Sequence, residues 1–249
     1  MDEPTPAPPL SQRTRQLLPP ALGYIAGYVD GCTFVALFGL FVAQVTGSFV
    51  VAGAVLGVGR HSRLIDLFAI PAFILGAVVA SALSTILRHR GLRASPVLLG
   101  LEGVLLAGML ATALLAPDIE NLDQPAALIV GLFGLSAMGV QNAFVGLHIK
   151  GAPSTNVMTT NTGNLAIDAA HVLTVAWLER FPSAASRPPE AEQARRRLAK
   201  TAPVVLAFLA GTVSGTLAWR AFGFVCLAAP LALLSILAAL AALRQFGDE

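Results

Sequence analysis

The stretch GYVDGCTFVALFGLFVAQVTGS, residues 27–48, is apolar enough to cross a membrane but is interrupted twice. Asp30 places a carboxylate among apolar residues, and a polar cluster ends the expected helix before a second apolar run begins. Backbone that leaves helical geometry at membrane depth is tolerated only where protein or a water-filled cavity satisfies its polar groups. The stretch therefore predicts a broken helix beside a polar interior. The cluster consists of Gln44, Thr46, Gly47 and Ser48.

The composition is that of a multi-pass membrane protein. Hydrophobic residues make up 55% of the 249 positions and charged residues only 12%, whereas a typical soluble domain carries about 25% charged residues. The mean hydropathy is +0.73. About 20 apolar residues suffice for a helix to cross a bilayer, and the sequence predicts six such spans: residues 22–43, 67–87, 96–116, 126–149, 202–219 and 222–243.

The basic residues predict the orientation, because short loops rich in Lys and Arg stay in the cytoplasm. If each span crosses once with the N-terminal tail inside, all of the 16 Lys and Arg residues except Arg60, Arg63 and Arg220 are cytoplasmic. Both termini are then cytoplasmic. The expected organisation is a disordered tail (1–19), a first membrane repeat (20–116), an external loop (117–125) and a second membrane repeat (126–244) that contains a cytoplasmic loop (179–200).

Two shorter apolar stretches, residues 49–58 and 165–178, follow the polar breaks after the first and fourth spans. If the first of them crossed the membrane, the arginine-rich loop at residues 88–93 would be forced outside. We therefore expect both to be half-helices, either re-entrant or lying at the membrane interface.

Small and polar residues recur in the same order in the two halves of the chain, which indicates a repeat. With three spans in each half, the second half would be inverted relative to the first, an architecture found in many secondary transporters. The predicted fold is an all-α integral membrane protein with six transmembrane helices in two inverted three-helix repeats, each with a broken half-helix. The matching landmarks are residues 27–31 with 139–143 (offset 112), 46–48 with 159–161 (offset 113), and Gly76 and Ala80 with Gly211 and Gly215 (offset 135). An alternative alignment pairs residues 162–164 with the first break.

The sequence resembles the YoaK-like family of bacterial membrane proteins over roughly residues 20 to 243. The resemblance is carried by G-x-x-D-G and T-G-S in the first half, and by A-M-G-V-Q-N-A and S-T-N-V-M-T-T-N-T-G-N in the second. It implies a six-span protein of the bacterial cytoplasmic (inner) membrane. The family is largely uncharacterised, so the resemblance supplies no substrate.

The polar residues at the breaks are candidates for a substrate or ion pathway. Burying an unpaired carboxylate in a membrane costs at least about 3 kcal/mol, so Asp30 is either a functional group or a structural hydrogen-bond acceptor. Gln141 and Asn142 either line the pathway or join helices. The candidates at the second break are Thr159, Asn161, Gly163 and Asn164.

Asp168 and His171 extend this set, because they share one helical face with Asn164. If that face lines a cavity, His171 can change charge near neutral pH with Asp168 as its partner. If the helix lies at the interface, the face is merely solvated. Glu102 in the third span is either buried in a pair or part of the pathway.

The sequence gives little support to enzymatic chemistry. It contains no HExxH motif and no Walker-type loop, and Ser214 has no histidine placed to act as a base. We expect no catalytic residues, no metal and no cofactor. Cys32 and Cys226 are expected to be core thiols. A net charge of +2 spread over loops argues against a nucleic-acid partner.

Two function classes remain. The first is a secondary transporter (permease) of an unidentified small solute, with ion or proton coupling left open. The second is a non-transporting membrane scaffold that binds a partner through its cytoplasmic loop. The lipid bilayer is the one certain partner, and the sequence leaves open whether the chain forms a homo-oligomer.

Overall fold

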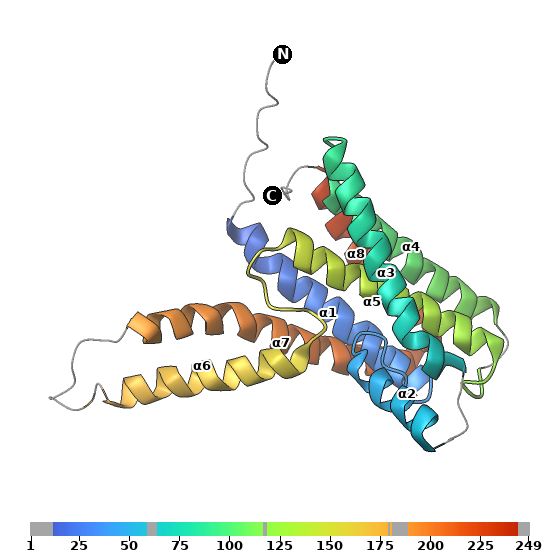
Figure 1. Cartoon of the computed structure of the whole chain (residues 1–249), viewed down its shortest axis with the longest axis horizontal. Helices are drawn as coiled ribbons and strands as arrows, with labels where there is room; N and C mark the ends of the chain where they lie inside the picture. Colours follow the sequence, from blue (N-terminus) through green and yellow to red (C-terminus); the bar gives the residue numbers. More distant parts are fainter. Residues whose placement is uncertain (1–11, 59–63, 117–118, 179, 181–188, 244–249) are drawn as a thin grey trace, which may run out of the picture.

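The computed structural model describes residues 12–58, 64–116, 119–178, 180 and 189–243. Over these residues the chain folds as eight α-helices and one 3-10 helix (Figure 1). The elements are α1 (Gln12–Ala36), α2 (Thr46–Val58), α3 (Leu64–His89), α4 (Ala94–Leu115), α5 (Pro125–His148), α6 (Met158–Leu178), α7 (Pro189–Phe222), η1 (Gly223–Leu227) and α8 (Ala228–Ala242).

Four segments of the described residues are long and apolar enough to cross a membrane. They are Leu67–His89, Ala94–Leu115, Pro125–His148 and the continuous segment Glu190–Ala242, which joins α7, η1 and α8. The outer faces of these helices carry large apolar side chains, such as Leu75, Val104 and Leu206, each more than half exposed. Apolar surface of this extent suits a lipid environment.

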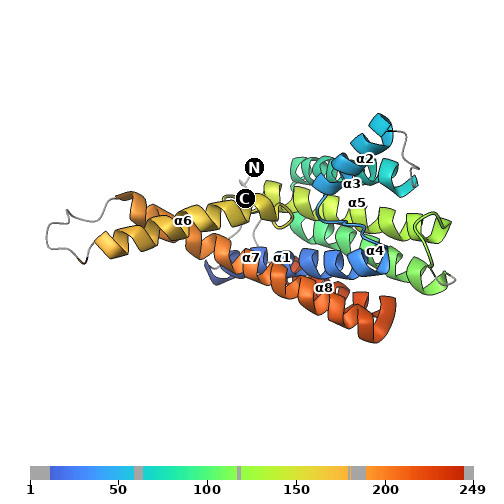
Figure 2. The ribbon, with the colours of Figure 1, turned by 90° about the horizontal axis from the view of Figure 1, so that it is seen from below.

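The helices form a bundle with α5 near its centre. α5 packs against α3 and α4, α1 packs mainly against α7, and α4 also packs against α8. α6 contacts the N-terminal half of α7, and the two form a hairpin that projects from one end of the bundle (Figures 1 and 2). The short helix α2 lies at the edge of the bundle beside α3.

Glycines bring the backbones of α1 and α7 into direct contact. A Cβ at Gly27 would overlap the carbonyl oxygen of Phe208, and a Cβ at Gly211 would overlap that of Tyr24. Small residues allow this close approach in membrane helices, where van der Waals contact replaces the hydrophobic effect as the driving force.

The same contacts join α5 and α3. A Cβ at Gly139 would overlap the carbonyl oxygen of Phe73, and one at Gly76 would overlap that of Ser136. The α5 residues follow their α1 counterparts by 112 positions (27 to 139, 24 to 136), and the α7 residues follow their α3 counterparts by 135 (73 to 208, 76 to 211). These are two of the three offsets that the sequence landmarks predict. The third, 113 for residues 46–48 with 159–161, is not found, because α2 and α6 begin 112 positions apart.

Several expected boundaries were wrong. Residues 12–19, expected in a disordered tail, are helical in α1, where Leu18 is buried against the bundle. Residues 189–200, expected in a loop, begin α7, where Arg196 pairs with Glu192 one turn away. The last expected span begins with η1, in which Gly223 has a φ of 56°, and becomes α-helical only at Ala228. The stretch expected as a second half-helix belongs to the 21-residue helix α6.

Candidate functional site

The first helix ends at Ala36 in a left-handed turn. Gly39 N donates to the carbonyl oxygen of Phe34 at 2.8 Å, and Phe38 has a φ of 50°. This six-to-one hydrogen bond after a left-handed residue is the Schellman arrangement that ends many helices. The break therefore occupies residues 37–45, earlier than expected, and Thr46, Gly47 and Ser48 form the first turn of α2.

Asp30 holds this break against α1. Its Oδ1 accepts hydrogen bonds from the backbone N–H groups of Val42 and Ala43, both at 2.8 Å. Asp30 is 2% exposed. Because Asp30 lies six residues before the end of α1, the chain turns back by about 9 Å along the helix. The carboxylate thus satisfies backbone groups that burial would otherwise leave unpaired.

The second break, residues 149–157, is held in a similar way by Gln141. Its Nε2 donates to Thr155 Oγ1 at 2.9 Å and to the carbonyl oxygen of Leu22 on α1 at 3.0 Å. Asn156 Nδ2 donates to the carbonyl oxygen of Met138 at 3.2 Å. The chain after α5 therefore also folds back along the helix that it has just left.

The two breaks have the same length and the same spacing. Each contains nine residues, and both helix ends are displaced by 112 positions (36 to 148 and 46 to 158). This offset pairs Asp30 with Asn142 and Gln44 with Asn156.

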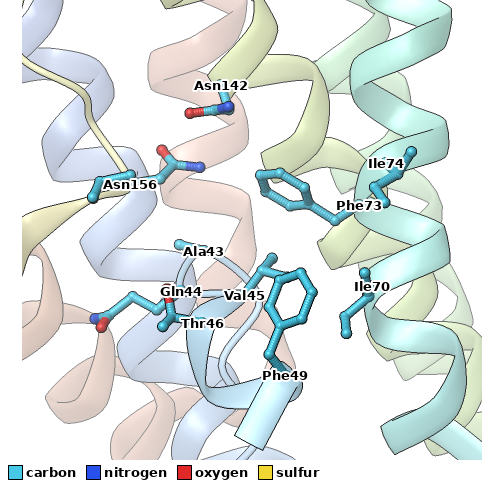
Figure 3. Close-up of a pocket in the computed structure, with 11 residues that line it drawn as sticks. Ala43, Gln44, Val45, Thr46, Phe49, Ile70, Phe73, Ile74, Asn142 and Asn156 are labelled. Carbon is cyan, nitrogen blue, oxygen red and sulfur yellow. The ribbon is translucent and has the colours of Figure 1, made fainter. Parts of the chain in front are cut away.

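A pocket of about 250 Å³ lies between the two breaks (Figure 3). The first break and α2 contribute one wall, α3 contributes Phe73 and two isoleucines, and Asn142 and Asn156 come from α5 and the second break. Its polar groups are amides and a hydroxyl, and no charged side chain lines it. The lining residues are Ala43, Gln44, Val45, Thr46, Phe49, Ile70, Phe73, Ile74, Asn142, Asn156 and Val157.

The pocket gathers only some of the predicted candidates. Gln44, Thr46 and Asn142 line it, and Asp30 and Gln141 hold the breaks that form it. Sequence reasoning missed Asn156, although its displacement of 112 from Gln44 was a usable signal. Ser48 is buried at the start of α2, Asn161 donates to the carbonyl oxygen of Ser154, and Gly47, Thr159, Gly163 and Asn164 are exposed.

Asp168 has a partner that the sequence did not indicate. Its buried carboxylate accepts from Arg197 on α7, with Nη2 at 2.8 Å from Oδ1 and Nε at 3.1 Å. His171, the expected partner, is partly exposed one turn further along α6. The ion pair ties α6 to α7 within the projecting hairpin.

Two other findings concern buried polar groups. Glu102 on α4 is 0% exposed, and neither carboxylate oxygen has a hydrogen-bond partner in the described part of the chain. Cys32 on α1 and Cys226 in η1 bring their Sγ atoms to 3.4 Å. Among the described residues, no group of three or more His, Cys, Asp or Glu side chains could hold a metal ion.

The fold and the pocket thus define an all-helical protein with membrane-type helices and two interrupted segments. A family profile described as "Protein of unknown function (DUF1275)" matches residues 20–240. The chain belongs to this family. No curated protein and no solved structure matches the chain.

Proposed function

We propose that the protein is a secondary transporter of a small, uncharged polar solute, which binds in the pocket between the two breaks. The observation that carries the proposal is the composition of that pocket, which is lined by Gln44 of the first break, Thr46 at the start of α2 and Asn156 of the second break. Transporter sites commonly lie where interrupted helices meet near the membrane midplane.

We further propose that the chain has six spans in two inverted repeats. The equal breaks and the matched glycine contacts at offsets of 112 and 135 support this arrangement. In this arrangement the protein lies in the bacterial inner membrane with both termini cytoplasmic, as the basic residues and the YoaK-like resemblance imply.

The class of solute follows from the lining. Amide and hydroxyl groups offer both donors and acceptors, while Phe49, Phe73 and Ile70 offer an apolar surface. A volume of about 250 Å³ lies below the usual range of about 300–1,000 Å³ for drug-sized ligands. The proposed solute is therefore a compact amphipathic molecule without net charge, and neither catalysis nor a cofactor is part of the proposal.

Scaffolding is the second candidate. It is favoured by the hairpin of α6 and α7, which projects from the bundle and leaves Leu173 and Trp177 more than half exposed. In a scaffold this hairpin binds a partner protein, and the pocket binds no solute.

The test is thermal stabilisation of the purified full chain across a library of small metabolites. Transport predicts that some uncharged polar members raise the melting temperature of the wild type. Asn142→Ala should abolish this shift, and the matched control Asn121→Ala, in the exposed loop before α5, should retain it. A library without effect on the wild type, or equal shifts in both variants, would overturn the proposal.

A further inference from the structure

Glu102 is a buried acid that the pocket does not use. It lies in the middle of α4, with both carboxylate oxygens unpartnered among the described residues. Burying an ionised carboxylate without a counter-ion or a hydrogen-bond donor is very unfavourable, and more so inside a membrane. A protonated carboxyl has a much lower cost of burial. The environment of Glu102 therefore suits a group that carries a proton.

A second unsatisfied group lies at the level of Glu102 on α5. A Cβ at Gly134 would lie 3.3 Å from Met109 Sδ, which fixes the register of α4 against α5. Glu102 lies seven residues, or about two turns, before Met109 on α4, and Gln141 lies seven residues after Gly134 on α5. Because the two helices are antiparallel, both steps run in the same direction, so Glu102 and Gln141 lie at the same level. Gln141 is 0% exposed, and its Oε1 also has no partner in the described structure.

Gln141 connects this level to the second break. The other end of its amide, Nε2, donates to Thr155 Oγ1 at 2.9 Å, and Thr155 Oγ1 in turn donates to Asn156 Oδ1 at 2.8 Å. Asn156 lines the pocket. A change in what Gln141 contacts would therefore reach the pocket through two hydrogen bonds.

We propose that Glu102 and Gln141 form a proton-binding site that controls the second break. With the proton bound, the Glu102 carboxyl donates to Gln141 Oε1, directly or through one water molecule, and Nε2 stays on Thr155. When the proton leaves to water, the carboxylate can only accept, so it competes with Thr155 for the N–H groups of Gln141. Naming the proton as a coupling ion rests on the proposed transport function, whereas the site itself does not.

Few other titratable groups lie on the elements packed against α4. Those with described side chains are His148 of α5, which contacts Ser84, Cys226 of η1, and Arg88 and His89 at the end of α3. α8 carries none. Among the described side chains of α4 and the elements packed against it, Glu102 is thus the single carboxylic acid.

The proton can be observed without any variant. The full chain in lipid nanodiscs, with carbon-13 in its glutamate carboxyls, would be examined by infrared spectroscopy from pH 5 to pH 9. We expect a carboxylic-acid band that shifts with the label and persists at pH 7, where exposed glutamates are ionised. Absence of a label-sensitive acid band at pH 7 would overturn the proposal.

Variants test the link to the break. Glu102→Gln should remove the acid band, while the control Glu120→Gln, on an exposed side chain, should keep it. Hydrogen exchange of residues 149–157 should be faster in the wild type than in Glu102→Gln at pH 9, and equal at pH 6. If the wild type and Glu102→Gln exchange equally fast at pH 9 as well as at pH 6, Glu102 does not control the break. If Glu102→Gln does not fold, Gln141→Leu provides the second comparison, since its protection at the break, corrected for the intrinsic pH dependence of amide exchange, should not change between pH 6 and pH 9.

Stability gives a third measurement. The native state holds a proton that the unfolded chain releases above about pH 4.3, so the native state becomes less stable as the pH rises. Above about pH 4.3, the ratio of the wild-type unfolding constant to that of Glu102→Gln should rise about tenfold for each pH unit. The rise should stop at the pH where Glu102 ionises in the native state. Parallel profiles would overturn the assignment. None of these measurements uses a solute, so their failure is distinguishable from failure of the pocket experiment.

Discussion

Gly27 and Gly139 make the same contact in the two halves of the chain: each lies against a phenylalanine carbonyl oxygen, that of Phe208 on α7 and that of Phe73 on α3, respectively. The absence of a side chain is what allows both helix pairs to touch. Each contact fixes the position of a helix that leads into a break.

Alanine at either glycine should therefore destabilise the protein. The added Cβ would overlap backbone, which cannot move aside as a side chain can, and overpacking of this kind typically costs about 1–3 kcal/mol. Gly146→Ala is the matched control, because nothing lies within 4 Å of its Cβ position. That control should be neutral or stabilise by up to about 1 kcal/mol through helix propensity. Thermal unfolding in detergent measures the stability of all three variants. If Gly146→Ala loses as much stability as the other two, the close backbone contacts at Gly27 and Gly139 are not the cause.

Asp30 should act chiefly as an anchor of the first break. Asp30→Ala leaves the N–H groups of Val42 and Ala43 buried without an acceptor, at a cost of about 1–3 kcal/mol for each group. Asp30→Asn keeps one oxygen that can accept and should be milder. Hydrogen exchange of residues 37–45 measures this difference, and it should be faster in Asp30→Ala than in Asp30→Asn. If Asp30→Asn is fully stable but loses pH-dependent transport, Asp30 rather than Glu102 carries the proton.

The two cysteines should be trapped as a disulfide by a membrane-permeant oxidant such as iodine. Their Sγ atoms are 3.4 Å apart although the residues are separated by 194 positions. Two thiols would lose two protons and two electrons to the oxidant, and both would then resist alkylation in the denatured chain. Cys32→Ser is the control, and its remaining thiol should stay reactive. Full alkylation of the oxidised wild type would show that α1 and η1 do not meet.

Accessibility labelling should establish the orientation. In a background without Cys32 and Cys226, a cysteine at Asn121 should react with an impermeant reagent added to intact cells, and one at Arg90 should react only after lysis. Both side chains are exposed in the structure, so burial would not hide either. Strong labelling at Arg90 from outside would reverse the proposed topology.

The sequence predicted the long apolar helices α3, α4 and α5 and the offsets of 112 and 135, because hydrophobic length and small residues are local signals. The offset of 113 at the breaks was wrong, because α2 and α6 begin 112 positions apart. The first break was misplaced because the polar residues at 44–48 look like a helix stop, whereas the helix ends at Ala36, the left-handed Phe38 follows, and the chain then returns to Asp30. The pairing of Asp168 with Arg197 and the contact between the cysteines could not be predicted, since both depend on helix packing across long separations.

The partnership of α1 with α7 also sets an order of assembly. Gly27 of α1 touches Phe208, about 180 residues later in the chain. At about 5–20 residues per second, α1 waits roughly 10 to 40 seconds for its main partner. During that time its glycine face is uncovered, although the N–H groups of Val42 and Ala43 already reach Asp30, so a newly inserted α1 depends on lipid, on the insertion machinery or on α5 until α7 has been made.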